Sequence, residues 1–305
     1  MPRRKSRRVQ ALMVLMIDCL SMFMRLNSVG KRVSHRSRLA AVAVGAALVL
    51  AGLPLVTARA SSGAPAHWTA PTTADMTSQS TGSATPNTLT PEEQRDGWKL
   101  LFDGKMTTGW RGAYLDTFPE RGWTVENGEL IVLESGGAES THGGDIVTVD
   151  EYSNFELVMD FNLTPGANSG IKYFVTEEQG GTGASAIGLE YQLLDDERHE
   201  DAKRGRPGTR MLASLYDLIP AENRPINPPG EWNTARIVSR DRHVEHWLNG
   251  TKVLEYERGS ADYRKLVAES KYANWERFGE SDKGRILLQD HGNRVTFRNI
   301  KIRVD

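Results

Sequence analysis

Short runs in which apolar and polar residues alternate follow one another from Trp98 to the end of the chain. In "NFELVMDFNL", for example, Phe155, Leu157, Met159 and Phe161 alternate with neighbours that are mostly polar. A period of two places such residues on one face of a strand, and many short strands of this kind are typical of an antiparallel β-sandwich or jelly roll. The sequence therefore predicts an all-β fold.

The remaining local signals fit this fold class. Asn127-Gly128 and Asn249-Gly250 predict hairpins, because these residue types accept the positive φ angles of tight turns. Helices are expected only at Pro91–Asp96 and Ala261–Asn274. Long loops are expected at residues 135–145, 176–186 and 195–231, and loops of that length are usually functional or disordered.

The N-terminal region has the order of a secretory signal. A basic segment precedes an apolar run from about Leu39 to Val56, and Ala58-Arg59-Ala60 offers an A-x-A cleavage site. An uncleaved membrane anchor is the alternative. We expect residues 1–60 to be a signal peptide region cleaved near Ala60, and the mature protein to be secreted or periplasmic without stable membrane insertion.

The next segment is expected to be a linker. Of residues 61–90, 23 of 30 are Ser, Thr, Pro, Ala or Gly, a composition that predicts a disordered Ser/Thr/Pro linker before a folded domain at residues 91–305. The single cysteine, Cys19, lies before the predicted cleavage site, so the domain must be stabilised by its core rather than by disulfides.

Net charge excludes one class of partner. The first 60 residues hold 11 Lys and Arg and one acidic residue, so the remaining 245 carry 27 Lys and Arg against 38 Asp and Glu. A nucleic-acid backbone requires a basic face, and a body with a net charge of −11 argues against such a partner.

Two strands end in polar residues that could form a site. In "GLEYQLLDD", alternation places Glu190 and Gln192 on one face, which is either a solvated face or the floor of a groove. In "RILLQDHG", a strand predicted from Ile286 to His291, Gln289 shares one face with His291; the alternative for His291 is a turn residue. If Glu190 and His291 pointed to opposite faces, this site hypothesis would be wrong.

The charged loop after the first of these strands offers further candidates. Asp195, His199 and Asp201 are an oxygen and nitrogen set of the kind that binds metal ions, although their spacing matches no strong metal motif and a simple charged loop is the alternative. His246 projects with apolar neighbours, so we expect it to be a hydrogen-bonded core residue. The motifs of nucleophilic hydrolases, P-loops and zinc proteases do not occur.

Several motifs together resemble one family. "LLFDGKMTTGW", "WTVENGELIV", "FELVMDFNLTPGANSGIKYF", "LEYQLLDDERHEDAKRGRPGTRMLASLYDLIPA", "EHWLNG" and "ILLQDHGNRVTFRNIKIR" are similar to the 3-keto-disaccharide hydrolase family, over about Gly97 to Val304. The resemblance implies a concanavalin A-like (laminin G-like) jelly-roll sandwich. It also implies cleavage of glycosides already oxidised at C3, by 3-keto-glucoside 1,2-lyase or 3-keto-2-hydroxyglucal hydratase chemistry.

That chemistry requires a base for the acidic C2 proton, a donor or cation for the enolate oxygen and an acid for the leaving group at C1. A divalent metal ion would be one source of the cation. Our hypothesis assigns the C2 base to Glu190 or His291, with His199 and Asp195 orienting it or binding a metal. Sugar hydroxyls would be held by Asn168, Gln192 and Gln289, and the enolate or leaving group by Lys172, Arg210 and Tyr216.

Two other functions fit the same sequence. The first is a non-catalytic carbohydrate-binding module of the same fold, which would bind unoxidised sugar without turnover. The second is a hydrolase of ordinary glycosides, which needs two carboxylates about 5–10 Å apart. Glu190 is the one clear carboxylate that the sequence places on the groove floor.

Overall fold

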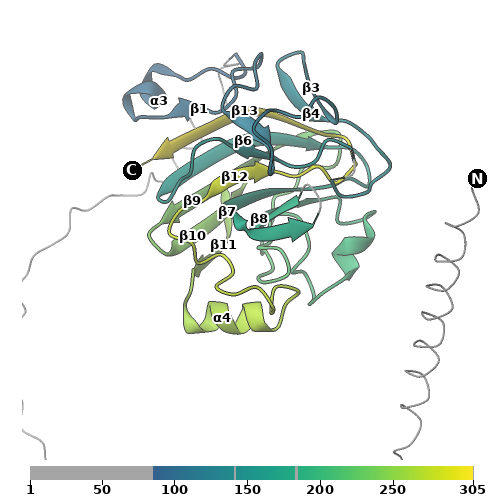
Figure 1. Ribbon diagram of the computed structural model, residues 1–305. Helices are drawn as coiled ribbons and strands as arrows, with labels where there is room; N and C mark the ends of the chain where they lie inside the picture. Colours follow the sequence, from purple (N-terminus) through teal and green to yellow (C-terminus); the bar gives the residue numbers. More distant parts are fainter. Residues whose placement is uncertain (1–84, 141, 183–184, 305) are drawn as a thin grey trace, which may run out of the picture. The chain divides into compact units, whose positions relative to one another are not determined.

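Two antiparallel β-sheets pack face to face in the part of the chain that the computed structural model describes, residues 85–140, 142–182 and 185–304 (Figure 1). The larger sheet contains β1 (Lys99–Leu100), β3 (Trp123–Glu126), β4 (Glu129–Val132), β6 (Phe155–Leu163), β9 (Trp232–Arg240), β10 (His243–Leu248), β11 (Thr251–Glu257) and β13 (Val295–Val304). Its strand order is β11-β10-β9-β6-β13-β4-β3, and β1 also pairs with β13.

The smaller sheet contains β2 (Trp110–Gly112), β5 (Ile146–Thr148), β7 (Asn168–Thr182), β8 (Ser185–Leu194) and β12 (Arg285–Leu288), in the order β2-β5-β12-β7-β8. The predicted all-β jelly-roll sandwich with short helices is therefore confirmed. In β7 and β8 the register pairs Lys172 with Glu190 and Gly170 with Gln192, so these residues share a neighbourhood on one face of the sheet.

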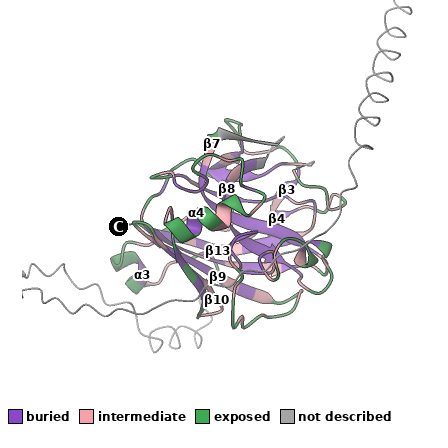
Figure 2. Cartoon of the chain, turned by 90° about the horizontal axis from the view of Figure 1, so that it is seen from below, coloured by how far each residue is buried: buried purple, intermediate pink, exposed green. Residues whose placement is uncertain are grey.

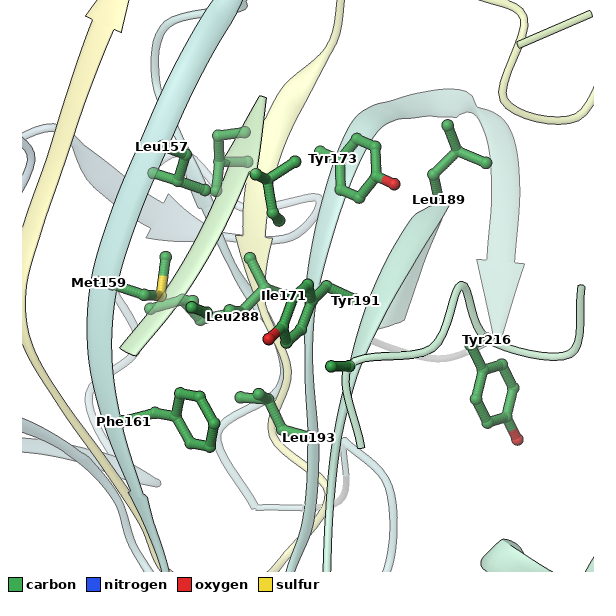
Figure 3. Packing of buried hydrophobic residues seen from close by; sticks show 14 of the residues in the cluster. Leu157, Met159, Phe161, Ile171, Tyr173, Leu189, Tyr191, Leu193, Tyr216 and Leu288 are labelled. Carbon is green, nitrogen blue, oxygen red and sulfur yellow. The ribbon is translucent and has the colours of Figure 1, made fainter. Parts of the chain in front are cut away.

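Alternate residues of both sheets fill the layer between them. Figure 3 shows Leu157, Met159 and Phe161 of β6 directed into the same layer as side chains of β7 and β8. Tyr191 and Leu193 of β8 are fully buried there. Because strand side chains alternate, the residues between these core positions must point to the outer face of the smaller sheet.

The two predicted hairpins are present. Asn127 and Gly128 connect β3 to β4 with φ angles of 54° and 81°, and Asn249 and Gly250 connect β10 to β11 with φ angles of 47° and 80°. Two successive positive φ angles match the right-handed twist of the paired strands. The turn residues thus set the register of both hairpins.

The helices are short and lie at the edges of the sandwich (Figure 1), and most of α4 is exposed (Figure 2). Helix α3 (Pro91–Arg95) begins with a capping box, in which Thr90 accepts from the Glu93 amide and Glu93 accepts from the Thr90 amide. Helix α4 (Ala261–Ala268) ends six residues before the predicted end at Asn274. A 3-10 helix (Glu200–Lys203) lies in the long loop after β8.

Two other predicted boundaries were wrong. Strand β12 ends at Leu288 rather than at His291, although the Gln289 amide still donates to the Gly170 carbonyl at 3.0 Å. The loop expected at residues 176–186 is largely strand, because β7 and β8 continue through bulges into a long hairpin.

Contacts with the sandwich begin at Asn87, within the segment expected to be linker. Asn87 and Asn299 exchange hydrogen bonds of 2.6 and 2.8 Å through their amide groups and backbone nitrogens. The predicted signal peptide region and residues 61–84 of the linker lie outside the described residues. Among the described residues, no helix has the length and apolar character needed to span a membrane.

A polar network lies within the core. His246 Nδ1 donates to the Ala213 carbonyl at 2.9 Å, so its Nε2 accepts from the Tyr173 hydroxyl at 2.7 Å, and Tyr256 Oη lies 2.8 Å from Tyr173 Oη. Burial lowers the pKa of His246 to about 4. His246 is therefore a neutral core residue, as expected from its apolar neighbours.

Tyr173→Phe should lower the free energy of unfolding by about 1–3 kcal/mol, because it leaves His246 Nε2 and the Tyr256 hydroxyl without their buried partner. Chemical denaturation checks this. Tyr152→Phe is the matched control, since Tyr152 is also buried but its hydroxyl makes no hydrogen bond to a described residue. Equal stability of the two variants would contradict a stabilising network.

Candidate active site

A pocket with a cavity of about 120 Å³ lies on the outer face of the smaller sheet. Glu190 and Gln192 reach it from β8, between core residues that point the other way. The residues around the pocket are mostly polar, and they come from the neighbouring strands β7 and β8 and from four segments outside the strands. They are Glu139, Asn168, Lys172, Ile187, Gly188, Glu190, Gln192, Tyr216, Lys271, Tyr272, Gln289 and His291.

The floor of the pocket holds two buried ionisable groups side by side. Glu190 and Lys172 are cross-strand partners, and each is only 5% exposed. Burial raises the pKa of Glu190 to about 7, an effect that the charges of Lys172 and Lys271 partly offset. Burial opposes the charge of Lys172 too, but the carboxylates of Asp145, Glu190 and Glu139 outweigh it and raise the pKa of Lys172.

Lys172 is held closely by the protein. Its Nζ lies 3.5 Å from Asp145 Oδ2 and 4.0 Å from Glu139 Oε1, and it donates to the Ala186 carbonyl at 3.3 Å. Asp145 is completely buried. Lys172 and Asp145 therefore form a buried ion pair at the pocket floor.

Gly170 makes room for the Glu190 carboxylate. A Cβ atom at Gly170 would lie 2.5 Å from Glu190 Oε1, closer than any normal contact. The Gln192 amide lies beside the same carboxylate, and when oriented to donate, its Nε2 is 3.0 Å from Glu190 Oε1. Because Gly170 has no side chain, it leaves space for the Glu190 carboxylate, which lies between Gly170 and Gln192.

Gln289 and His291 line the same pocket as Glu190. Gln289 Nε2 donates to Glu139 Oε1 at 3.0 Å. Gln289 Oε1 and His291 Nδ1 are buried atoms without a hydrogen-bond partner among the described residues. Buried polar atoms are normally paired, so these two are well placed to meet a ligand.

Asp290, between Gln289 and His291, binds backbone amides instead of lining the pocket. Its Oδ2 accepts from the amides of Gly143 and Gly144, both at 3.0 Å, and its Oδ1 accepts from the Gly292 amide at 2.9 Å. These bonds fix the 135–145 loop, which carries Glu139, against the end of β12. The Gln-Asp-His sequence therefore supplies two pocket residues and one loop anchor.

Tyr216 forms one wall, on a segment beyond β8, and its ring also belongs to the cluster of buried hydrophobic residues (Figure 3). Its hydroxyl donates to Asp201 Oδ2 at 2.6 Å, and Arg210 Nη1 donates to Asp201 Oδ1 at 3.0 Å. Arg210 Nε also donates to Asp217 Oδ1 at 2.6 Å. Arg210 does not line the pocket, and its bonds to Asp201 and Asp217 hold the wall that Tyr216 forms; its contact with substrate stays a prediction.

Asp195 and His199 also lie outside the pocket. The Asp195 carboxylate accepts from the backbone amides of Gly166, Glu197 and Arg198 and from the Arg198 guanidinium. Although burial opposes it, these bonds lower the pKa of Asp195, which is a turn anchor. His199 packs edge-on behind His291, with 5.9 Å between ring centroids, and burial together with His291 lowers its pKa.

The three residues suggested as metal ligands, Asp195, His199 and Asp201, do not converge on one point. Asp201 is bonded to Tyr216 and Arg210, Asp195 to its own turn, and His199 Nδ1 accepts from the Asp201 amide. Within the described ranges, one group of three metal-ligand atoms lies within 4.8 Å, and it consists of His243, Glu245 and Glu255 on the larger sheet. The potential ligands in the pocket, Glu139, Glu190 and His291, are more widely spaced than that.

Sequence reasoning missed Glu139, Lys271 and Tyr272. Glu139 lies in the 135–145 loop, whose length was the one available signal. Lys271 and Tyr272 follow α4 in a segment that the sequence predicted to be helical, where neither residue was recognisable as part of a site. Tyr272 is buried, with its ring stacked on Phe278 at a centroid distance of 3.9 Å.

Comparisons with known proteins agree with one another. Residues 97–303 match the family model described as a 3-keto-alpha-glucoside-1,2-lyase-like domain. The chain is 37% identical over 247 residues to a 3-keto-disaccharide hydrolase of Bacteroides thetaiotaomicron, covering 74% of this chain and 85% of that protein.

Two solved structures of predicted glycosyl hydrolases from Parabacteroides distasonis are also similar. The first is 36% identical with a TM-score of 0.63, and the match covers 72% of this chain and all of that chain. The second is 30% identical with a TM-score of 0.52, over 68% of this chain and 99% of that chain.

The burial of Glu190 predicts a pH-dependent stability effect. Its pKa is raised in the folded state, so the cost of the buried charge is absent below about pH 4.5 and complete above about pH 7. Glu190→Gln should therefore stabilise the protein at pH 8, by about 3 kcal/mol, and have little effect at pH 4.5.

Thermal and denaturant unfolding at the two pH values measure this difference. Glu231→Gln is the control, because Glu231 is exposed. If Glu190→Gln were destabilised equally at both pH values, ionisation of the buried Glu190 carboxylate would carry no free-energy cost.

Proposed function

The chain belongs to the 3-keto-disaccharide hydrolase family, whose domains are 3-keto-alpha-glucoside-1,2-lyase-like, and on this premise we propose that it cleaves 3-keto-glycosides by elimination across C1 and C2. The observation that carries the proposal is the Glu190 carboxylate, buried on the pocket floor with its pKa raised to about 7. A general base is most effective when its pKa lies near the working pH.

The first half of the reaction needs no nucleophile. A ketone at C3 makes the C2 proton acidic, and Glu190 removes it while the electron pair moves toward the C3 oxygen. The enolate then expels the oxygen at C1, forming a C1–C2 double bond. His291 in its protonated form gives a proton to the departing alcohol. The products are a 3-keto-2-hydroxyglucal and the free aglycone.

The second half reverses the two proton transfers. Water adds to C1 and loses a proton to His291, while Glu190 returns its proton to C2. The two residues regain their starting states, and the net reaction is hydrolysis to a free 3-keto sugar. Both steps pass through negative charge on the C3 oxygen, which the buried positive charge of Lys172 would stabilise.

The remaining polar groups suit a sugar ring. Asn168, Gln192 and Gln289 are amides, at most 5% exposed, that line the pocket. Amides both donate and accept hydrogen bonds, as sugar hydroxyls do. A carbohydrate-binding module would need such groups as well, but it has no need of a buried carboxylate with a raised pKa.

Glu139 supports a second candidate function. It lines the pocket together with Glu190, so the site offers two carboxylates, the minimum set for direct hydrolysis of ordinary glycosides. The two mechanisms differ in substrate, because elimination requires the C3 ketone and direct hydrolysis does not.

Activity on matched substrates tests the proposal. We expect turnover of a 3-keto-glucoside but not of its parent glucoside, with 3-keto-2-hydroxyglucal visible by NMR as an intermediate or product. Glu190→Gln should reduce kcat about 10³-fold and His291→Ala about 10²-fold. His243→Ala, on the larger sheet, is the control for loss of an exposed histidine and should leave kcat unchanged.

Turnover of the parent glucoside at a similar rate, with strong loss in both Glu190→Gln and Glu139→Gln, would favour the two-carboxylate mechanism instead. Binding of unoxidised sugar without any turnover would favour the binding module.

The pH profile gives a separate test. Because Glu190 must be ionised to act as the base, kcat/KM should rise with pH through an apparent pKa of about 7. A profile that stays flat down to pH 5 would mean that another group removes the proton.

A further inference from the structure

Lys271 lines the pocket from the segment that follows α4. The residue is exposed to solvent, but its side chain extends over the pocket wall that Tyr216 forms. Its Nζ lies 4.2 Å from the centroid of the Tyr216 ring and 5.1 Å from that of Tyr272. The ammonium group is thus held over two aromatic rings rather than extended into solvent.

The two pocket lysines differ in what already occupies their donors. Lys172 Nζ is engaged by Asp145, Glu139 and the Ala186 carbonyl. Lys271 Nζ has neither a hydrogen bond nor an ion pair within 4.0 Å to any residue in the described ranges. All three of its N–H donors therefore remain for a ligand.

The backbone that carries Lys271 is fixed by the charged network behind Tyr216. Asp217 Oδ2 accepts from the Lys271 amide at 2.7 Å, and Asp217 Oδ1 accepts from Arg210 Nε at 2.6 Å. Arg210 in turn binds Asp201, which accepts from the Tyr216 hydroxyl. The same network thus places both the ammonium group and the ring beneath it.

We propose that Lys271 is a catalytic residue, which donates a hydrogen bond from its ammonium group to the C3 oxygen of the bound 3-keto sugar as that oxygen becomes negative. This inference rests on the proposed elimination, and it assigns to Lys271 the contact with the enolate oxygen.

Stereochemistry favours Lys271 over Lys172 for this contact. A C2 proton is removed most easily when the base approaches perpendicular to the plane of the C3 carbonyl, so that the breaking bond overlaps the carbonyl π system. The carbonyl oxygen then points to the side of the ring, away from the strand that carries the base. Lys172 is the strand neighbour of Glu190, whereas Lys271 reaches the pocket from a segment outside the sheet, after α4.

The effect of Lys271 on the base agrees with this arrangement. Burial lowers the pKa of Lys271, although the charge of Glu190 opposes the shift, and the charge of Lys271 in turn lowers the pKa of Glu190. The two groups therefore face the same space with opposite charge.

Steady-state kinetics on a 3-keto-glucoside test the assignment with Lys271→Met and Lys271→Arg. Loss of a donor that acts mainly in the transition state should lower kcat of Lys271→Met about 10²- to 10³-fold while KM changes less than about threefold. Lys271→Arg should recover part of kcat. The acid limb of the pH profile should move to higher pH in Lys271→Met, since a charge that favours ionised Glu190 is gone. Lys265→Met, an exposed lysine on α4, is the matched control and should behave as the wild type.

Unfolding curves of each variant would show that loss of kcat is not loss of fold, and Lys271→Gln replaces Lys271→Met if the latter is unstable. A Lys271→Met enzyme with kcat within threefold of the wild type, or with a change in KM alone, overturns the inference. If Glu190→Gln is inactive in the same assay, the proposed elimination stands without Lys271. If the wild type does not turn over the 3-keto-glucoside, the proposed function itself fails.

Discussion

Glu190 and Lys172 face each other across β7 and β8, buried on the side of the smaller sheet that points away from the core. Removing two charges from water costs several kcal/mol for each ion unless neighbouring groups compensate. Asp145 compensates Lys172, and Gln192 lies beside Glu190 in the space that Gly170 leaves open. The compensation is incomplete for Glu190, because burial raises its pKa to about 7, and a carboxylate with such a pKa suits the role of base that we propose for it.

The rest of the site depends on carboxylates that never reach the pocket. Asp290 holds the 135–145 loop through Gly143 and Gly144, and so positions Glu139. Asp201 and Asp217 hold Arg210, Tyr216 and the Lys271 backbone. Asp195 closes the turn after β8. The sheet supplies the floor by strand alternation, whereas buried ionic contacts within the loops supply the walls.

This division explains what the sequence could and could not predict. Alternation is a local property of a strand, so the sequence alone predicted that Glu190 and Gln192 share one face of β8, and both line the pocket. Gln289 and His291 line it too, but they follow the end of β12, so their position depends on the segment after the strand. Their convergence depends on β12 pairing with β7, a contact between segments more than 100 residues apart, and it was stated as a hypothesis. Asp195, His199 and Arg210 were chosen for their residue types, and residue type does not distinguish a loop anchor from a ligand. Lys271 and Tyr272 could not be found, because no local pattern reveals that a turn after a short helix folds over a distant sheet.

The central claim is that the C2 proton is removed during cleavage, and its exchange with solvent measures this directly. A 3-keto-glucoside would be turned over in D₂O, and the released 3-keto sugar examined by NMR at short times, with the uncatalysed exchange of the substrate subtracted. Elimination followed by hydration predicts one deuterium at C2 of the product in each turnover, because the proton returned to C2 comes from a carboxyl group that equilibrates with solvent. A product that retains protium at C2 would contradict the account and point to direct displacement at C1.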